Sequence, residues 1–193
     1  MQGRVLVLTG TIASGKSTAA RIFVSLGAYL ISLDEITHEL LVTDEDLIKE
    51  IAATFGTRVL AQDGSVDRQQ LAARVFSDDE ARLKLESIMH PKIIRVARTR
   101  IAANTGRVIV LEVPLLDRAE EFAARADEII WVRTSEDKAR VRALQRGLTQ
   151  SKYQRRRDAQ PEEEYLARHA TIVIENDGNI DELKEKIQEL NLI

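Results

Sequence analysis

Residues 10–18 read Gly-Thr-Ile-Ala-Ser-Gly-Lys-Ser-Thr, in which the second glycine is followed directly by Lys16 and Ser17. Glycines permit a tight turn whose backbone N–H groups point inward, and such a concavity binds anions. Lys16 can reach the β- and γ-phosphates of a nucleotide, and the Ser17 hydroxyl can hold Mg²⁺. The pattern is a phosphate-binding P-loop, and it predicts that the chain binds a nucleoside triphosphate.

The segments on both sides of the loop support this interpretation. An apolar run at 5–8 predicts a buried strand that leads into the loop, and a helical pattern from Lys16 to Leu26 leaves it. The partial positive charge of a helix N-terminus favours a phosphate there. The alternative, a glycine-rich turn with a solvated lysine, is less favoured. The expected phosphate-binding residues of the loop are Gly10, Thr11, Ala13, Ser14, Gly15, Lys16, Ser17 and Thr18.

The elements that must position this loop belong to the α/β class. Apolar, β-branched runs predict parallel strands with helical patterns between them, so we expect a P-loop NTPase with a doubly wound five-stranded parallel sheet. Gly27 and Gly147 are placed to end two of the helices. The predicted strands are 4–9, 28–31, 107–113, 128–132 and 170–175.

The alternation is interrupted between the second and third predicted strands by about 75 residues, far more than one crossover helix needs. We therefore expect a helical substrate-binding insertion at about 32–104 and a short lid at about 144–166. The remaining segments, about 1–31, 105–143 and 167–193, would form the core of a single P-loop domain. Within the insertion, helical patterns lie near 45–55, 67–76, 78–88 and 91–104, and Ser77-Asp78-Asp79-Glu80 has the form of a capping box.

A carboxylate, Asp34, follows the second predicted strand. Because the carboxyl ends of parallel strands border the ligand crevice, Asp34 is expected to face the site, where it can accept the proton of an attacking hydroxyl. Alternatively, Asp34 caps a helix at 35–42, and the two roles are compatible. His38 lies one helical turn beyond, either as a contact of the acceptor or as an ordinary surface residue.

Glu112 ends the third apolar run, and Pro114 then stops the strand because proline lacks the N–H that a sheet requires. An acid in this place can stand near the Mg²⁺ of a P-loop enzyme. Ser17 and Glu112 are therefore the candidate metal residues. The alternative for Glu112 is an exposed acid at a strand end.

A run of eight basic residues without an acid extends from Lys138 to Arg157. Arg142 and Arg146 are four positions apart, so they share a helix face and can both point at one polyphosphate, which guanidinium groups bind well. One alternative is a solvated helix face. Another is nucleic-acid binding, which is disfavoured because the run lacks interleaved aromatic side chains on which bases could stack. The triple 155–157 is expected at the surface or on the lid.

His90-Pro91-Lys92 separates two helical patterns of the insertion. Proline at the first position of a new helix is sufficient to explain Pro91. His90 and Lys92 can also contact an anionic substrate. The single tryptophan, Trp131, lies in a predicted strand and is expected in the core.

The composition excludes several classes of protein. The 193 residues carry a formal net charge of −3, so no overall attraction to nucleic acid or to an anionic membrane is expected. The absence of cysteine excludes disulfides and thiolate metal sites. No apolar stretch is long enough to span a membrane, and a core strand is predicted to begin near residue 4. We therefore expect a cytoplasmic protein without a signal peptide. The sequence does not determine the oligomeric state, for which a monomer is favoured.

These residues together resemble the dephospho-CoA kinase family over nearly the whole chain. The P-loop and its strand fit the family's pattern, and other short motifs follow in the family's order and spacing. They include Ser32-Leu33-Asp34 with Ile36 and His38, Phe55-Gly56, Asp63-Gly64, Asp67-Arg68, Leu71, Val75-Phe76-Ser77, Leu85-Glu86, His90-Pro91-Lys92-Ile93, Pro114-Leu115-Leu116, Gln145-Arg146, Gln160 and Ile174-Glu175-Asn176-Asp177-Gly178.

The resemblance implies ATP-dependent phosphorylation of the ribose 3′-hydroxyl of dephospho-CoA, giving coenzyme A and ADP, with Mg²⁺ bound beside ATP. It implies catalytic roles for Asp34, Lys16, Arg142 and Arg146, of which the two arginines also bind ATP. The implied acceptor-binding residues are Asp34, His38, His90, Lys92, Pro114 and Leu115. The alternatives are another small-molecule or nucleoside monophosphate kinase of the same fold, or a nucleotide-binding switch without turnover.

Four departures from the family pattern are visible. Ser32 stands where an aspartate is usual, and Thr11 replaces a common glycine of the loop. Asp117-Arg118 follows the Pro-Leu-Leu motif where a glutamate is usual, and 162–164 is acidic where the family is often basic. None of these changes removes a phosphoryl-transfer residue.

Overall fold

The computed structural model describes residues 3–75 and 78–193, and these residues form two compact units. The core unit consists of the N-terminal segment up to Ser32 together with Asn104–Ile193. The inserted unit consists of Leu33–Ala103. Among the described residues, no helix combines the length and apolar character needed to cross a membrane.

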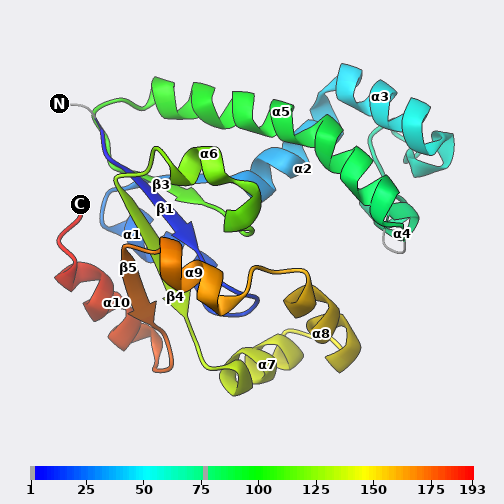
Figure 1. Ribbon diagram of the computed structural model, residues 1–193. Helices are drawn as coiled ribbons and strands as arrows, with labels where there is room; N and C mark the ends of the chain where they lie inside the picture. Colours follow the sequence, from blue (N-terminus) through cyan, green and yellow to red (C-terminus); the bar gives the residue numbers. More distant parts are fainter. Residues whose placement is uncertain (1–2, 76–77) are drawn as a thin grey trace. The chain divides into compact units, whose positions relative to one another are not determined.

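The core unit is built on a five-stranded sheet in which neighbouring strands are parallel (Figure 1). The strand order is β2-β3-β1-β4-β5, so the strand that precedes the P-loop lies at the centre. This confirms the predicted doubly wound sheet. The strands are β1 (Val5–Thr9), β2 (Tyr29–Ser32), β3 (Ile109–Glu112), β4 (Glu128–Arg133) and β5 (Ile172–Glu175).

Helices cover both faces of this sheet. Leu6 and Leu8 of β1 pack with Phe23 of α1 (Lys16–Ser25) and with Leu183 of α10 (Ile180–Glu189), and all four side chains are buried. Alternate residues of a strand point to opposite faces, so Trp131 of β4 lies on the other side, where it is 3% exposed, as expected for a core residue. Figure 1 shows α6 (Glu120–Ala123) and α9 (Glu163–His169) on that side.

The remaining elements of the core unit follow β3 and β4. A short 3₁₀ helix, η2 (Leu116–Arg118), comes after β3. After β4, α7 (Glu136–Gln145) ends at Gly147, whose φ of +84° suits glycine, and α8 (Gln150–Asp158) begins soon after it. Gly27, at φ +114°, ends α1 in the same way. Both helix ends agree with the prediction from the sequence.

The inserted unit is helical. Its elements are α2 (Leu33–Thr43), α3 (Glu45–Phe55), η1 (Thr57–Val59), α4 (Arg68–Val75) and α5 (Asp79–Ala103). The side chain of Asp44 accepts a hydrogen bond from the Leu47 N–H and so caps α3. Asp78 plays the same part for α5 by accepting from Ala81 N–H. The capping box predicted from Ser77 and the motif at 75–77 extend outside the described residues.

The prediction of two helices, at 78–88 and 91–104, is wrong, because α5 is one helix that contains Pro91. Proline removes one helical hydrogen bond and crowds the preceding turn. Buried side chains on both sides of it, Ile88 and Met89 before and Ala97 after, hold the two halves against the rest of the unit. Packing therefore outweighs the local cost, and Pro91 is not the first residue of a new helix.

Candidate active site

The P-loop connects β1 to α1 in a conformation that depends on its two glycines. A Cβ atom on Gly10 would lie 2.6 Å from both the Ser14 hydroxyl and the carbonyl oxygen of Val132. Gly15 has φ +97°, and a Cβ atom there would lie 2.1 Å from Nδ2 of Asn176. Both positions therefore require glycine, and Gly15 requires it for conformation as well as for space.

The loop must also accommodate the Cβ atoms of Thr11 and Ala13. Ala13 has φ +59°, a left-handed conformation that costs a non-glycine residue about 1–2 kcal/mol. Thr11 is 9% exposed, and its φ is not positive. The loop therefore accommodates the Thr11 Cβ atom without the cost of a left-handed conformation. The Ser14 N–H donates to the carbonyl oxygen of Thr11 at 3.1 Å and closes the turn.

A buried amide supports the loop from β5. Nδ2 of Asn176 donates a hydrogen bond to the carbonyl oxygen of Ser14 at 2.7 Å. Asn176 is 6% exposed and directly follows β5. The sequence suggested Asn176 only as part of a family motif, because no local pattern predicts a contact between residues 162 positions apart.

Lys16, Ser17 and Glu112 meet where β1 and β3 end. The Ser17 hydroxyl donates to Oε1 of Glu112 at 2.9 Å, and Nζ of Lys16 lies 3.8 Å from the same oxygen. The Glu112 side chain is 11% exposed, so it is not the exposed strand-end acid of the alternative interpretation. Charge pairing with Lys16 offsets part of the cost of burying both groups.

The donor set at this point fits a hard divalent cation. A hydroxyl and a carboxylate oxygen are ligands that Mg²⁺ accepts, and this ion commonly uses one or two carboxylates together with substrate phosphates. Among the described residues, no group of three acidic, histidine or cysteine side chains forms a separate metal cage. Ser17 and Glu112 are thus brought together as the metal prediction requires.

Arg142 of α7 is fixed beside the loop that follows β5. Its guanidinium donates to the Thr134 hydroxyl at 3.4 Å and to the carbonyl oxygen of Gly178 at 3.3 Å. The same Thr134 hydroxyl donates to Asp177 at 2.7 Å. This bond and a second one from the Ser135 N–H lower the pKa of Asp177 to about 2. The network is a structural support for Arg142 that the sequence did not reveal.

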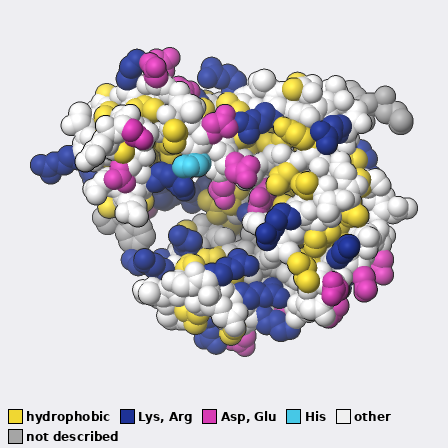
Figure 2. Space-filling model, turned by 180° about the vertical axis from the view of Figure 1, so that it is seen from behind, with side chains coloured by type: hydrophobic (Ala, Val, Ile, Leu, Met, Phe, Trp, Pro, Cys, Tyr) yellow, Lys and Arg dark blue, Asp and Glu magenta, His cyan; other side chains and the backbone are white. Residues whose placement is uncertain are grey.

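Other basic residues of the predicted lid are less constrained. Arg146 is the exposed C-cap residue of α7 and belongs to the same helix face as Arg142. Figure 2 shows Lys and Arg side chains gathering in the lower part of this face of the molecule, where α7 and α8 lie. Arg155 is exposed and lies one helical turn after Ser151, and its guanidinium donates a hydrogen bond to the carbonyl oxygen of Ser151. The basic run thus forms a charged surface with Arg142 at its inner end.

Two acceptor candidates of the core unit follow β3. Pro114 and Leu115 are half-buried, and the next residue, Leu116, is fully buried at the start of η2. The buried Leu116 fixes where this short segment runs. Pro114 and Leu115 are therefore surface-accessible residues at the carboxyl end of β3, the edge of the sheet that also carries Glu112.

In the inserted unit, α2 presents Asp34 and His38 to solvent, one helical turn apart. The helix begins at Leu33, so Asp34 lies in its first turn and not at the cap position of the alternative interpretation. An ion pair between Glu39 and Arg100 joins α2 to α5. The carboxylate of Asp34 is thus carried by a helix that packs against a long neighbour.

Two further candidates, His90 and Lys92, lie on α5. Nζ of Lys92 contacts both carboxylate oxygens of Asp44, at 2.9 and 3.1 Å. This bond, together with the bond from the Leu47 N–H, lowers the pKa of Asp44 below its ordinary value. Lys92 thus ties α5 to the cap of α3, and its role toward an acceptor stays a prediction. His90 is exposed.

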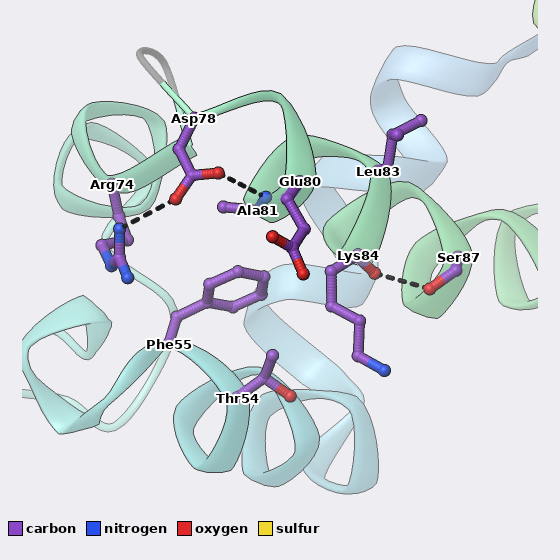
Figure 3. Close-up of a pocket in the computed structure, with 9 residues that line it drawn as sticks. All are labelled: Thr54, Phe55, Arg74, Asp78, Glu80, Ala81, Leu83, Lys84 and Ser87. Atoms are coloured by element: carbon purple, nitrogen blue, oxygen red, sulfur yellow. Dashed lines mark hydrogen bonds and ion pairs between the residues drawn. The ribbon is translucent and has the colours of Figure 1, made fainter.

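A pocket of ≈ 650 Å³ lies on the inserted unit among α3, α4 and α5 (Figure 3). The ring of Phe55 and the carboxylate of Glu80 point into it, and Arg74 pairs with Asp78 at 3.6 Å. The pocket contains none of the acceptor residues predicted from the sequence. Its lining residues are Thr54, Phe55, Arg74, Asp78, Glu80, Ala81, Leu83, Lys84 and Ser87.

Comparison with known proteins decides which kinases this site resembles. A profile of the dephospho-CoA kinase family matches residues 4–182. The chain belongs to this family. It is 36% identical over 186 residues to the dephospho-CoA kinase of Corynebacterium glutamicum, and the alignment covers 94% of each chain. The family's members are phosphotransferases, and their reaction is the final step of coenzyme A biosynthesis, so this chain is a kinase of that step.

Solved structures agree with this assignment. A protein from Thermus thermophilus has a TM-score of 0.85 and 28% identity, covering 99% of this chain and 97% of its own. The dephospho-CoA kinase from Campylobacter jejuni has a TM-score of 0.66 and 26% identity, covering 98% and 96%. A kinase with the P-loop fold uses ATP, typically with a divalent metal, which the geometry of the loop accommodates.

Proposed function

We propose that the chain transfers the γ-phosphoryl group of ATP to the ribose 3′-hydroxyl of dephospho-CoA, producing coenzyme A and ADP. The observation that carries the proposal is the cluster of Lys16, Ser17 and Glu112 beneath a P-loop in a chain of this family. In this proposal Lys16 compensates charge on the triphosphate, whereas Ser17 and Glu112 are the ligands proposed for a divalent cation.

On the donor side, α1 begins within the loop at Lys16, and the partial positive charge of a helix N-terminus favours phosphate oxygens there. Lys16 exchanges its contact with Glu112 for the β- and γ-phosphates. Arg142, held by Thr134 and Gly178, and the exposed Arg146 neutralise charge on the transferring group. The segment at about 144–166 acts as the lid and excludes water, which protects ATP from hydrolysis.

The divalent ion is proposed to be Mg²⁺. Ser17 and Glu112 would hold it, since a hydroxyl oxygen and a carboxylate oxygen are ligands that Mg²⁺ accepts. When bound, the ion compensates the negative charge on the β- and γ-phosphates.

On the acceptor side, Asp34 accepts the proton of the 3′-hydroxyl as this oxygen attacks phosphorus. The proposal is supported by the exposure of Asp34 in the first turn of α2 and by its place two residues after the end of β2. The acceptor-binding residues proposed for the inserted unit are His38, His90 and Lys92. For the core unit, Pro114 and Leu115 are proposed. The inserted unit, at about 32–104, is the acceptor-binding part of a single kinase domain.

The proposal is tested by ADP release from ATP and Mg²⁺ in the presence of different acceptors. Dephospho-CoA should stimulate release, whereas CMP, AMP, dTMP and shikimate should leave it near the rate without acceptor. Stimulation by a nucleoside monophosphate alone would assign the chain to the alternative kinase class. Tight nucleotide binding without stimulation by any acceptor would indicate a switch.

A further inference from the structure

The turn that follows α8 contacts the P-loop through one side chain. Oε1 of Gln160 accepts a hydrogen bond from the backbone N–H of Ile12 at 2.7 Å, across 148 positions of sequence. Ile12 is the third residue of the loop and directly precedes Ala13, which has the left-handed φ of +59°. The bond therefore acts on the part of the loop that is conformationally least relaxed.

The tip of the loop is also held by apolar contacts. Ile12 and Ala13 pack against Ala139 and Ala143 of α7 and against Tyr153 of α8, whose ring is buried. Apolar contacts are not directional, so they restrict where the tip lies but not where its N–H groups point. The hydrogen bond from Ile12 supplies the direction, because its strength falls steeply with angle.

Gln160 reaches the loop from a supported backbone. Its N–H donates to the carbonyl oxygen of Arg157 at 3.1 Å, and the next residue, Pro161, is buried. Arg157 pairs with Glu163 at 3.7 Å across the turn between α8 and α9. Glu163 in turn pairs with Arg133 at the end of β4, at 3.5 Å. The turn is thus tied at both ends, and the Gln160 side chain starts from a defined place.

A P-loop binds phosphate when successive N–H groups converge on one centre. The Gln160 carbonyl removes the Ile12 N–H from that set and fixes the peptide plane that leads into Ala13. We propose that Gln160 is a positioning residue of the phosphate site, which keeps the loop in its phosphate-ready shape by holding Ile12. The inference rests on the proposed function, since it takes the loop to be the ATP site.

Three variants test the inference. Gln160→Met removes the acceptor at nearly constant length, Gln160→Glu keeps an acceptor oxygen, and Gln188→Met makes the same change at an exposed position of α10. Hydrogen exchange of the nucleotide-free proteins, read on the peptide that contains Ile12, should become about tenfold faster in Gln160→Met alone. The KM for ATP should rise about fivefold in Gln160→Met, as expected for one lost hydrogen bond.

The KM for dephospho-CoA and the Tm should stay at the values of Gln188→Met. The inference is overturned if Gln160→Met matches Gln188→Met in exchange and in KM for ATP, or if Gln160→Glu loses protection as fully as Gln160→Met. It is also overturned if both KM values rise together with a lower Tm, which indicates general damage. If dephospho-CoA does not stimulate ADP release by the wild type, the proposed function is contradicted instead. Hydrogen exchange at Ile12 and the affinity for ADP would still test the role of Gln160.

Discussion

At the scale of single residues, two separate constraints keep a side chain from position 15 of the P-loop, which is Gly15. Its φ of +97° and the 2.1 Å approach of an added Cβ to Asn176 act together. The sequence pattern predicts a glycine here because the turn is tight. It does not predict the second reason, since the contact with Asn176 forms only when β5 joins the sheet.

Gly15→Ala is expected to lower the free energy of unfolding by about 2–4 kcal/mol, from the left-handed strain and from displacement of the buried Asn176 amide. Gly147→Ala is the matched control, because Gly147 has a similar φ of +84° but nothing within 4 Å of an added Cβ. It should cost only about 1 kcal/mol. Urea unfolding measures both, and equal losses would show that the Asn176 contact does not restrict the loop.

Asp34→Asn is expected to lower kcat by about 10²–10⁴-fold, because the amide cannot accept the proton of the acceptor hydroxyl. The KM for ATP should change by no more than a few-fold, since Asp34 is not part of the P-loop. Asp46→Asn is the control, an exposed acid in the first turn of the neighbouring helix α3. Steady-state kinetics decide the point, and a kcat like that of the control would remove Asp34 from the chemistry.

At the scale of elements, the loop after β5 and the start of α7 are joined through Asp177. Thr134 and the Ser135 N–H donate to its carboxylate, and Arg142 donates to Thr134 and to the carbonyl oxygen of Gly178. The arrangement explains why Arg142 is fixed although it belongs to a highly charged helix. Helical spacing predicted that Arg142 and Arg146 share a helix face. It did not predict the hydrogen bonds of Arg142 to Thr134 and Gly178.

The pKa of Asp177 gives a test of this junction. Because its pKa in the folded chain, about 2, is below the ordinary 3.8, the ionised carboxylate stabilises the fold above about pH 4, and this contribution is lost as the pH falls toward 2. At pH 6 the free energy of unfolding of the wild type should exceed that of Asp177→Asn by about 1 kcal/mol, a value reduced because Asp177 is partly exposed to solvent. Urea unfolding should show the difference shrinking by about half at pH 3, whereas a constant difference would contradict the assignment.

The helix α5 shows where local prediction ends. Proline is a reliable sign of a helix boundary when nothing compensates for the lost hydrogen bond. In α5 the buried residues on both sides of Pro91, and the ion pairs of Lys92 with Asp44 and of Arg100 with Glu39, keep the helix continuous. These compensating contacts come from α2 and α3, so the sequence around Pro91 alone could not reveal them.

At the scale of the whole molecule, the fold class followed from the sequence, because buried parallel strands are continuous apolar runs and the P-loop fixes the first strand-to-helix connection. The strand order β2-β3-β1-β4-β5 depends on pairings between distant segments and came from the structure. The helical insertion, in contrast, was predicted from the sequence, because about 75 residues between two strands exceed the length of one crossover helix. The roles of the individual acceptor residues stay predictions.

The central claim is tested most directly by identifying the product formed from ATP, Mg²⁺ and dephospho-CoA. We expect one coenzyme A per ADP, with the new phosphate at the ribose 3′ position, shown by mass spectrometry and by its release with a 3′-nucleotidase. Lys16→Ala should form neither product at an appreciable rate, because it lacks the charge that binds the β- and γ-phosphates. ADP formed without coenzyme A, or a phosphate at another position, would contradict the account.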